Sequence, residues 1–205
     1  MLKSMKLKIA VLISGSGTNL QALIDACAKA DYPAGIVLVI SNKAGAYGLT
    51  RAKNAGISCK VINHKDFSSR EEFDKAMSAE IIASGAEFVC MAGFMRLLSE
   101  WFVDTWHDKL INIHPSLLPS FKGIDAQKQA LEAGVKIAGC TVHFVRKEMD
   151  AGPIIIQAAV PILPGDTPET LSARILQEEH KCYPEALRLV SSGKVQIIGE
   201  ITEVK

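Results

Sequence analysis

Short apolar runs separated by amphipathic stretches dominate the first half of the chain. The runs occupy residues 9–13, 36–40, 59–62 and 88–92. Runs of this length that are apolar at every position are typical of strands covered on both faces, as in a parallel sheet. Strands that alternate with helices predict an open, doubly wound α/β sheet, in which ligands bind beyond the carboxyl ends of the strands.

The second half of the chain predicts a change in strand direction. Residues 110–113 form a fifth apolar run, whereas 137–145 and 154–161 are extended stretches joined only by a short loop. Two strands joined so closely pair antiparallel, so we expect a mostly parallel, mixed sheet with helices on both faces. After the turn at Gly193-Lys194, the sequence predicts a final short strand and a tail.

Helix signals flank these strands. Phe73, Met77 and Ile81 are spaced by four, which predicts the apolar stripe of a helix beginning near Ser69. Thr167-Pro168 is typical of a helix start, with Thr167 as N-cap and Pro168 at the first position. The buried side of this second helix is expected to carry Leu171, Ile175, Cys182 and Leu187. Pro184 is expected to kink or divide it.

No repeat, low-complexity segment or linker interrupts the 205 residues. We therefore expect a single domain over 1–205, of Rossmann type, with an N-terminal half at about 8–105 and a C-terminal half at about 106–200.

The charge of the chain is almost balanced. With 23 basic and 22 acidic residues the net charge is +1, which gives no general attraction to nucleic acid or membranes. An anionic substrate would need a local site. The basic segment from Met1 to Lys8 lacks the apolar stretch of a signal peptide, and no run is long enough to span a membrane. We expect a cytoplasmic protein, monomer or homodimer, that acts on small molecules.

The cysteines and histidines predict no metal chemistry. The five cysteines are scattered without any C-x-x-C pair, so they are interpreted as reduced thiols used in packing. None of the five histidines stands at ligand spacing from another. We expect no metal in the reaction.

Candidate chemistry is concentrated in residues 112–119, which read Asn-Ile-His-Pro-Ser-Leu-Leu-Pro. Because side chains alternate along a strand, Asn112 and His114 point the same way. Donors held on rigid backbone suit an enzyme that stabilises a developing oxyanion, and a nearby carboxylate would keep the imidazole charged. Asp150, in a tight loop after the apolar run 140–145, is the candidate carboxylate. A core histidine and a turn-forming aspartate remain the alternative.

A glycine-containing loop, Ser14-Gly15-Ser16-Gly17-Thr18-Asn19, follows the first strand and opens a helix. Backbone amides at a helix N-terminus bind anions. Leu20 replaces the third glycine of the dinucleotide fingerprint, and Ser41-Asn42 lacks the ribose-binding acid, so a phosphate monoester fits better than NAD. A turn without a ligand remains the alternative.

Other segments carry weaker signals. The segment 93–98 could form an apolar slot for a flat heterocycle, with Arg96 bridging to a carboxylate or a carbonyl, or it could simply pack the next helix. His143 is expected to support Asp150 or the substrate. Glu178 and Glu179 are adjacent acids on a predicted helix, a pattern that usually marks a solvated face.

Four motifs in this order carry a resemblance to a known family: S-G-S-G-T-N-L at 14–20, G-F-M-R at 93–96, N-I-H-P-S-L-L-P at 112–119 and H-F-V-x-x-x-x-D-x-G-P at 143–153. Together they resemble the phosphoribosylglycinamide formyltransferases, and the resemblance runs from about Lys8 to Ile198. It implies transfer of a formyl group from the cosubstrate 10-formyltetrahydrofolate to the amine of glycinamide ribonucleotide, in purine biosynthesis.

The resemblance also implies roles for individual residues. Asn112, His114 and Asp150 match the catalytic trio, with Asn112 also at the folate. The residues that match the ribonucleotide site are Gly15, Gly17, Thr18, Asn19, Leu20 and Glu179. Those that match the folate segments are Arg70, Met95, Arg96, Leu97, Leu98, Arg146, Lys147, Glu148, Met149 and Asp150. By the same resemblance, the N-terminal half binds phosphate and the C-terminal half binds folate and carries the catalytic residues. The loop 120–127 departs from the family, because some relatives carry histidines there.

Two rival functions remain. A tRNA formyltransferase or formyltetrahydrofolate hydrolase shares this catalytic core but carries an additional domain, which we do not expect after Lys205. A tRNA substrate would also favour a basic surplus. A non-catalytic nucleotide-binding module would explain the loop at 14–19 but not the trio.

Overall fold

A computed structural model describes residues 6–205 of the chain. Residues 1–5, which belong to the basic segment considered above as a targeting signal, lie outside the described residues. Within the part that is described, no helix is both long enough and apolar enough to cross a membrane.

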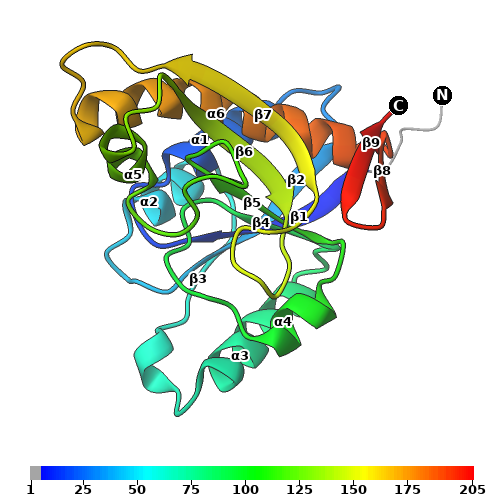
Figure 1. The fold of residues 1–205 in the computed structure, drawn as a ribbon. Helices are drawn as coiled ribbons and strands as arrows, with labels where there is room; N and C mark the ends of the chain where they lie inside the picture. The colour runs from blue at the N-terminus through cyan, green and yellow to red at the C-terminus, as the bar shows by residue number, and fades with distance from the viewer. Residues whose placement is uncertain (1–5) are drawn as a thin grey trace. The chain divides into compact units, whose positions relative to one another are not determined.

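The strands form a seven-stranded mixed sheet in the order β3-β2-β1-β4-β5-β6-β7, with a separate hairpin of β8 and β9 (Figure 1). Their bounds are Leu7–Ile13 (β1), Ala34–Ser41 (β2), Cys59–Val61 (β3), Phe88–Met91 (β4), Leu110–His114 (β5), Ile137–Phe144 (β6), Ile154–Pro161 (β7), Val195–Ile198 (β8) and Ile201–Val204 (β9). The expected α/β class with a mostly parallel, mixed sheet is confirmed. The chain divides into two compact units, Met1–Ile111 and Asn112–Lys205.

In the first unit, β1 pairs in parallel with both β2 and β4, and β2 pairs in parallel with β3. Residues 9–13 of β1 are completely buried, as the continuous apolar run predicts. The helices of this unit are α1 (Thr18–Cys27), α2 (Tyr47–Asn54), the 3₁₀ turn η1 (His64–Asp66), α3 (Arg70–Ala83) and α4 (Glu100–Thr105). Helix α3 begins where expected, since the Ser69 side chain accepts the Glu72 N–H as N-cap.

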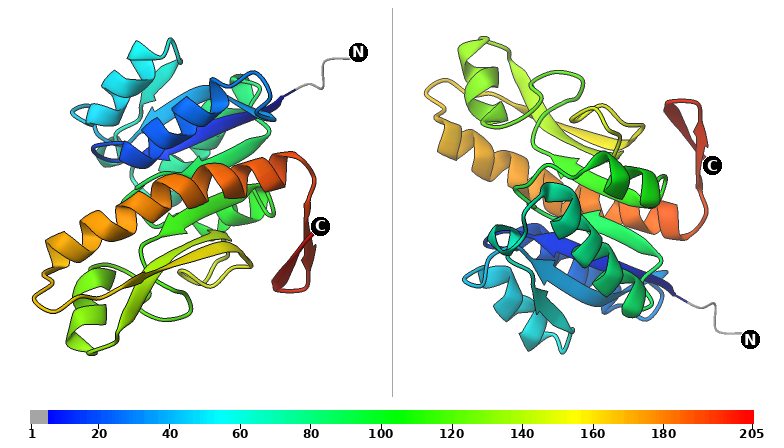
Figure 2. Two further views of the ribbon diagram at one scale, coloured as in Figure 1. Left: turned by 90° about the horizontal axis from the view of Figure 1, so that it is seen from above. Right: turned by 90° about the horizontal axis from the view of Figure 1, so that it is seen from below.

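In the second unit, β6 and β7 pair antiparallel as expected. Helix α5 (Ala126–Glu132) is short, and helix α6 (Pro168–Ser191) packs along β6 and β7 (Figure 2). Thr167 and Thr170 form a reciprocal capping box at the start of α6, which confirms the predicted N-cap.

Two expectations for the C-terminal region are corrected. Helix α6 is not divided at Pro184 but runs through it to Ser191. Cys182, Tyr183 and Leu187 are buried on either side of the proline, and this burial outweighs the loss of one helical hydrogen bond. The expectation of an unpaired tail after β8 is also wrong. The chain turns back after β8 and forms β9, which pairs antiparallel with β8.

Candidate active site

Strand β5 ends at the two predicted donors. Asn112 is half-buried and His114 is buried, two residues apart on the same face of the strand. No hydrogen bond of the Asn112 side chain is found within the described residues. It is therefore placed beside His114 by strand register alone.

The His114 imidazole lies between two oxygen acceptors. Its Nδ1 is 3.4 Å from Asp150 Oδ2, and its Nε2 is 2.9 Å from the Phe121 carbonyl oxygen. A neutral ring can donate from only one nitrogen, whereas an imidazolium donates from both. Each ring nitrogen of His114 thus faces an oxygen acceptor. The pair expected from the sequence is brought together from strand β5 and the loop before β7.

Asp150 is held by its backbone as well as by its neighbours. Its φ of 51° is left-handed, a conformation that Asp and Asn tolerate better than most residues. Its Oδ2 accepts the Gly123 N–H at 2.8 Å, and its side chain is only 10% exposed. The tight loop predicted at this position is therefore present and directs the carboxylate toward the imidazole.

His143, on β6, approaches the same carboxylate. Its Nε2 lies 3.8 Å from Asp150 Oδ1, and its Nδ1 is 2.8 Å from the Phe144 carbonyl oxygen. Burial lowers the pKa of His143 below its usual value, and the Phe144 carbonyl opposes this effect. A neutral His143 with its proton on Nδ1 would leave Nε2 without a proton to donate to Asp150.

The loop 120–127 contributes to the site through its backbone, which sequence reasoning missed. The Phe121 carbonyl and the Gly123 N–H contact His114 and Asp150, and Lys122 pairs with Glu148 of the Asp150 loop at 3.0 Å. No side-chain motif signals such contacts, because any residue has a carbonyl and almost any has an N–H.

The loop 14–19 lines a pocket of about 260 Å³ in the first unit, together with Lys43, Ala92, Gly93 and Met95. Ser14 anchors it: its Oγ donates to Asn42 Oδ1 at 2.6 Å and accepts the Met95 N–H at 2.8 Å. Of the residues expected at a ribonucleotide site, Gly15, Gly17, Thr18 and Asn19 line this pocket. Leu20 is fully buried in the core, so its side chain does not. Lys43 was missed by sequence reasoning.

The segment 95–98 is notably exposed for apolar residues. Met95 is 70% and Leu97 56% exposed, which fits a surface that a flat ring could cover. Arg70 and Arg96 are both exposed, and their charges act on the buried carboxylate of Asp74. Burial nevertheless raises the pKa of Asp74, whose Oδ2 accepts the Ser99 N–H. Asp74 therefore anchors the end of this segment.

The remaining predicted residues lie in the second unit. Arg146 pairs with Glu200 at 3.2 Å, while Lys147, Glu148 and Met149 are exposed. Glu179 is buried on α6, so the solvated-face interpretation of the Glu178-Glu179 pair is wrong for Glu179. The face of a helix that is covered depends on its neighbours in space, which adjacent acids in the sequence do not reveal.

All five cysteines are free thiols. Within residues 6–205, no group of three or more His, Cys, Asp or Glu side chains is arranged to hold a metal ion.

Comparison with known proteins agrees with this fold. Residues 7–187 match the formyl transferase family model. The chain therefore belongs to the formyl transferase family.

Three relatives show where in the family it falls. The trifunctional purine biosynthetic protein adenosine-3 of Gallus gallus is 56% identical over 97% of this chain, which spans only 20% of that protein. The phosphoribosylglycinamide formyltransferase of Haemophilus influenzae is 45% identical over 93% of this chain and 90% of its own length. The crystal structure of glycinamide ribonucleotide transformylase 1 from Symbiobacterium toebii is 50% identical, with a TM-score of 0.95 and coverage of 97% of this chain and 94% of that one.

Proposed function

We propose that this protein transfers the formyl group of 10-formyltetrahydrofolate to the amine of glycinamide ribonucleotide, in the cytoplasm and without a metal. The observation that carries the proposal is the close pair of His114 and Asp150 at the end of β5, in a chain that belongs to the formyl transferase family. The names of the relatives support the choice of substrate.

The proposed division of labour follows the two halves expected from the sequence. The loop 14–19 binds the ribonucleotide phosphate through backbone amides. Segments 95–98 and 146–150 bind the pterin along their backbone, with Arg70 nearer the opening, and Glu179 contacts the glycinamide. The exposed apolar surface of Met95 and Leu97 supports the pterin assignment.

Asn112 and protonated His114 act as donors to the oxyanion. When the substrate amine attacks the formyl carbon, a C–N bond forms and the carbonyl oxygen becomes an alkoxide. Donors aimed at that oxygen stabilise it more than the ground-state carbonyl. For His114 to serve in this way, its Nε2–H has to exchange the Phe121 carbonyl for the oxyanion.

Asp150 moves the proton and orients the imidazole. It receives the amine proton through a water and passes it toward N10 of the folate, so that the C–N10 bond breaks with a neutral leaving group. No covalent enzyme intermediate is formed. The 3.4 Å separation from His114 also supports its role in keeping the imidazole charged.

The replacement of Asp150 by Asn tests this function. Asn tolerates the left-handed backbone at this position, so the variant should fold and bind the ribonucleotide. Its turnover should fall by roughly 10²- to 10⁴-fold, the usual contribution of general acid–base catalysis. Spectroscopic release of deformylated folate, followed with and without glycinamide ribonucleotide, measures the rate.

The matched control is Asp31→Asn, which removes an exposed carboxylate that has no part in the site. Near-wild-type transfer by purified Asp150→Asn would refute the proposed role of Asp150. Folate release that needs no amine would instead indicate a hydrolase, and no release at all a binding module. A burst of formylated protein would rule out direct transfer.

A further inference from the structure

We propose that Arg51 of helix α2 is a positioning residue for the ribonucleotide phosphate. By holding the Ser16 carbonyl, it orients the following N–H toward the phosphate pocket. The inference rests on the proposed function, since it concerns how the loop 14–19 is prepared for its ligand.

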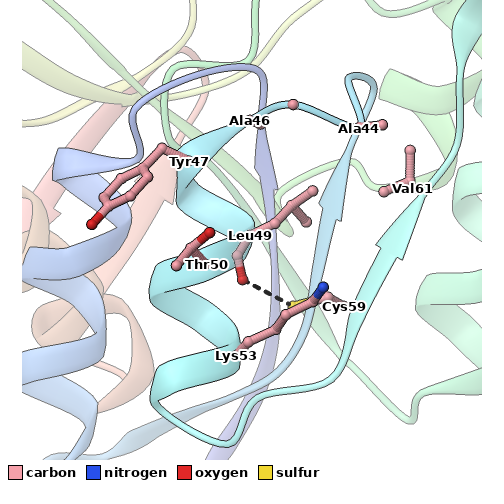
Figure 3. A pocket seen from close by; sticks show the side chains of 9 residues that line it. Ala44, Ala46, Tyr47, Leu49, Thr50, Lys53, Cys59 and Val61 are labelled. Atoms are coloured by element: carbon pink, nitrogen blue, oxygen red, sulfur yellow. Dashed lines mark hydrogen bonds between the residues drawn. The ribbon is translucent and has the colours of Figure 1, made fainter.

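The Arg51 guanidinium is fixed from three directions. Its Nε donates to the Ser16 carbonyl oxygen at 2.9 Å, and its Nη1 donates to Gln21 Oε1 at 3.3 Å. The guanidinium also lies 5.0 Å from the centre of the Tyr47 ring, a cation–π arrangement. Figure 3 shows Tyr47 and Cys59 on opposite sides of α2, and both line the surface pocket drawn there. Arg51 does not line that pocket, and its hydrogen bond to the Ser16 carbonyl directs it toward the loop.

The consequence follows from peptide geometry. In a trans peptide, the carbonyl of one residue and the N–H of the next point in opposite directions. The peptides of this loop are trans, because the cis bond found within residues 6–205 is Leu118-Pro119. When Arg51 holds the Ser16 carbonyl, the Gly17 N–H is turned the opposite way.

A second contact from α2 acts on the preceding peptide. The Gly48 N–H donates to the Gly15 carbonyl at 3.0 Å, which turns the Ser16 N–H away from α2. Consecutive N–H groups directed to one side form a concave anion site. The loop residues that carry them line the pocket of about 260 Å³, and in the described part of the chain neither N–H donates to a protein acceptor.

Close packing fixes the position of α2 against the loop. A Cβ built on Gly17 would lie 2.6 Å from the Gly48 Cα, and one built on Gly48 would lie 2.6 Å from Ile13 Cδ1. At Gly17, where the added Cβ would meet backbone, only glycine permits this approach. Helix α2 is therefore a rigid platform, that is, a fixed support for the loop. Its backbone binds the Gly15 carbonyl, and the Arg51 side chain binds the next carbonyl, that of Ser16.

The test compares Arg51→Met with Lys53→Met. Both variants remove one positive charge from α2, but only Arg51 holds a loop carbonyl. Residual dipolar couplings of the Ser16 and Gly17 N–H bonds, measured without ligand, report their orientation. Inorganic phosphate titrations followed by NMR, together with steady-state kinetics for both substrates, report the consequence.

Arg51→Met should change the residual dipolar coupling of the Gly17 N–H bond, with or without a change at the Ser16 N–H bond. It should also weaken phosphate binding and raise KM for the ribonucleotide by about tenfold, within the range for the loss of one ordinary hydrogen bond. The kcat at saturating substrate and the KM for the folate should stay within about twofold of the wild-type values. Lys53→Met should resemble the wild type in every measurement.

Three results would overturn the role of Arg51. Weaker phosphate binding with unchanged couplings would show that Arg51 acts through its charge alone. Equal losses of phosphate affinity in Arg51→Met and Lys53→Met would also show an effect of charge alone. Changed couplings with unaltered phosphate affinity would show that the orientation of the N–H bonds does not affect binding. A wild-type protein that binds phosphate yet transfers no formyl group would refute the proposed function, and the phosphate titration of Arg51→Met would still decide the role of Arg51.

Discussion

The replacement of Gly17 by Ala should be among the most costly single-methyl additions in the loop 14–19. Gly17 has a φ of 70°, and its added Cβ would lie 2.6 Å from the backbone Cα of Gly48. Ordinary contacts begin near 3.4 Å, so the loop and α2 have to separate by almost 1 Å. The left-handed backbone costs about 1–2 kcal/mol, and overpacking typically adds about 1–3 kcal/mol. We expect the free energy of unfolding to fall by roughly 2–5 kcal/mol.

Gly15→Ala is the matched control. No atom lies within 4 Å of a Cβ built on Gly15, and its φ is outside the left-handed region, so its stability should stay within about 1 kcal/mol of the wild type. Urea unfolding followed by circular dichroism measures both variants. If Gly17→Ala unfolds within about 0.5 kcal/mol of the wild type, the contact between the loop and α2 is not rigid, and the platform argument for Arg51 fails with it.

Three further outcomes are expected. Met77→Ala, at a fully buried position on α3, should lower the free energy of unfolding in urea by about 2–5 kcal/mol. Ile82→Ala, at a position 62% exposed on the same helix, should lower it by less than about 1 kcal/mol. Equal losses would contradict the predicted apolar stripe of α3. The Arg174 guanidinium holds the pKa of Asp166 well below its usual range, so its stabilisation is present above the unfolded pKa of about 3.9 and is lost as pH falls further. Asp166→Asn should therefore lower Tm at neutral pH, and the difference from wild type should shrink below about pH 4; a constant difference would refute this. Burial raises the pKa of Cys27 to about 11, so iodoacetamide at pH 8 should label it roughly a hundredfold more slowly in the folded than in the unfolded protein, as measured by peptide mass spectrometry.

Local patterns predicted most of the secondary structure. The strand 154–161 and the start of α6 at Pro168 agree with the expected positions, because apolar runs and capping residues act over a few neighbouring positions. The possible division of α6 at Pro184 and the unpaired tail after β8 were wrong. In both places, pairing or packing with residues that local rules ignore decided the outcome.

The candidate site was predicted in part. The approach of Asp150 to His114 agrees with the sequence-based expectation, but the roles of these residues stay predictions. The contacts of Phe121 and Gly123 are made by backbone groups, and the anchoring of the Ser16 carbonyl by Arg51 joins residues 35 positions apart. Neither kind of contact leaves a recognisable motif in the sequence.

The sequence by itself determined the alternation of strands and helices, the strand that carries Asn112 and His114, and the tight loop at Asp150. Each of these depends on the periodicity or the backbone preference of a few adjacent residues. Only the tertiary structure decided that Glu179 is buried, that His143 approaches Asp150, and that α2 contacts the loop 14–19. Burial and hydrogen bonding between distant segments depend on how the chain folds back on itself, which no local pattern specifies.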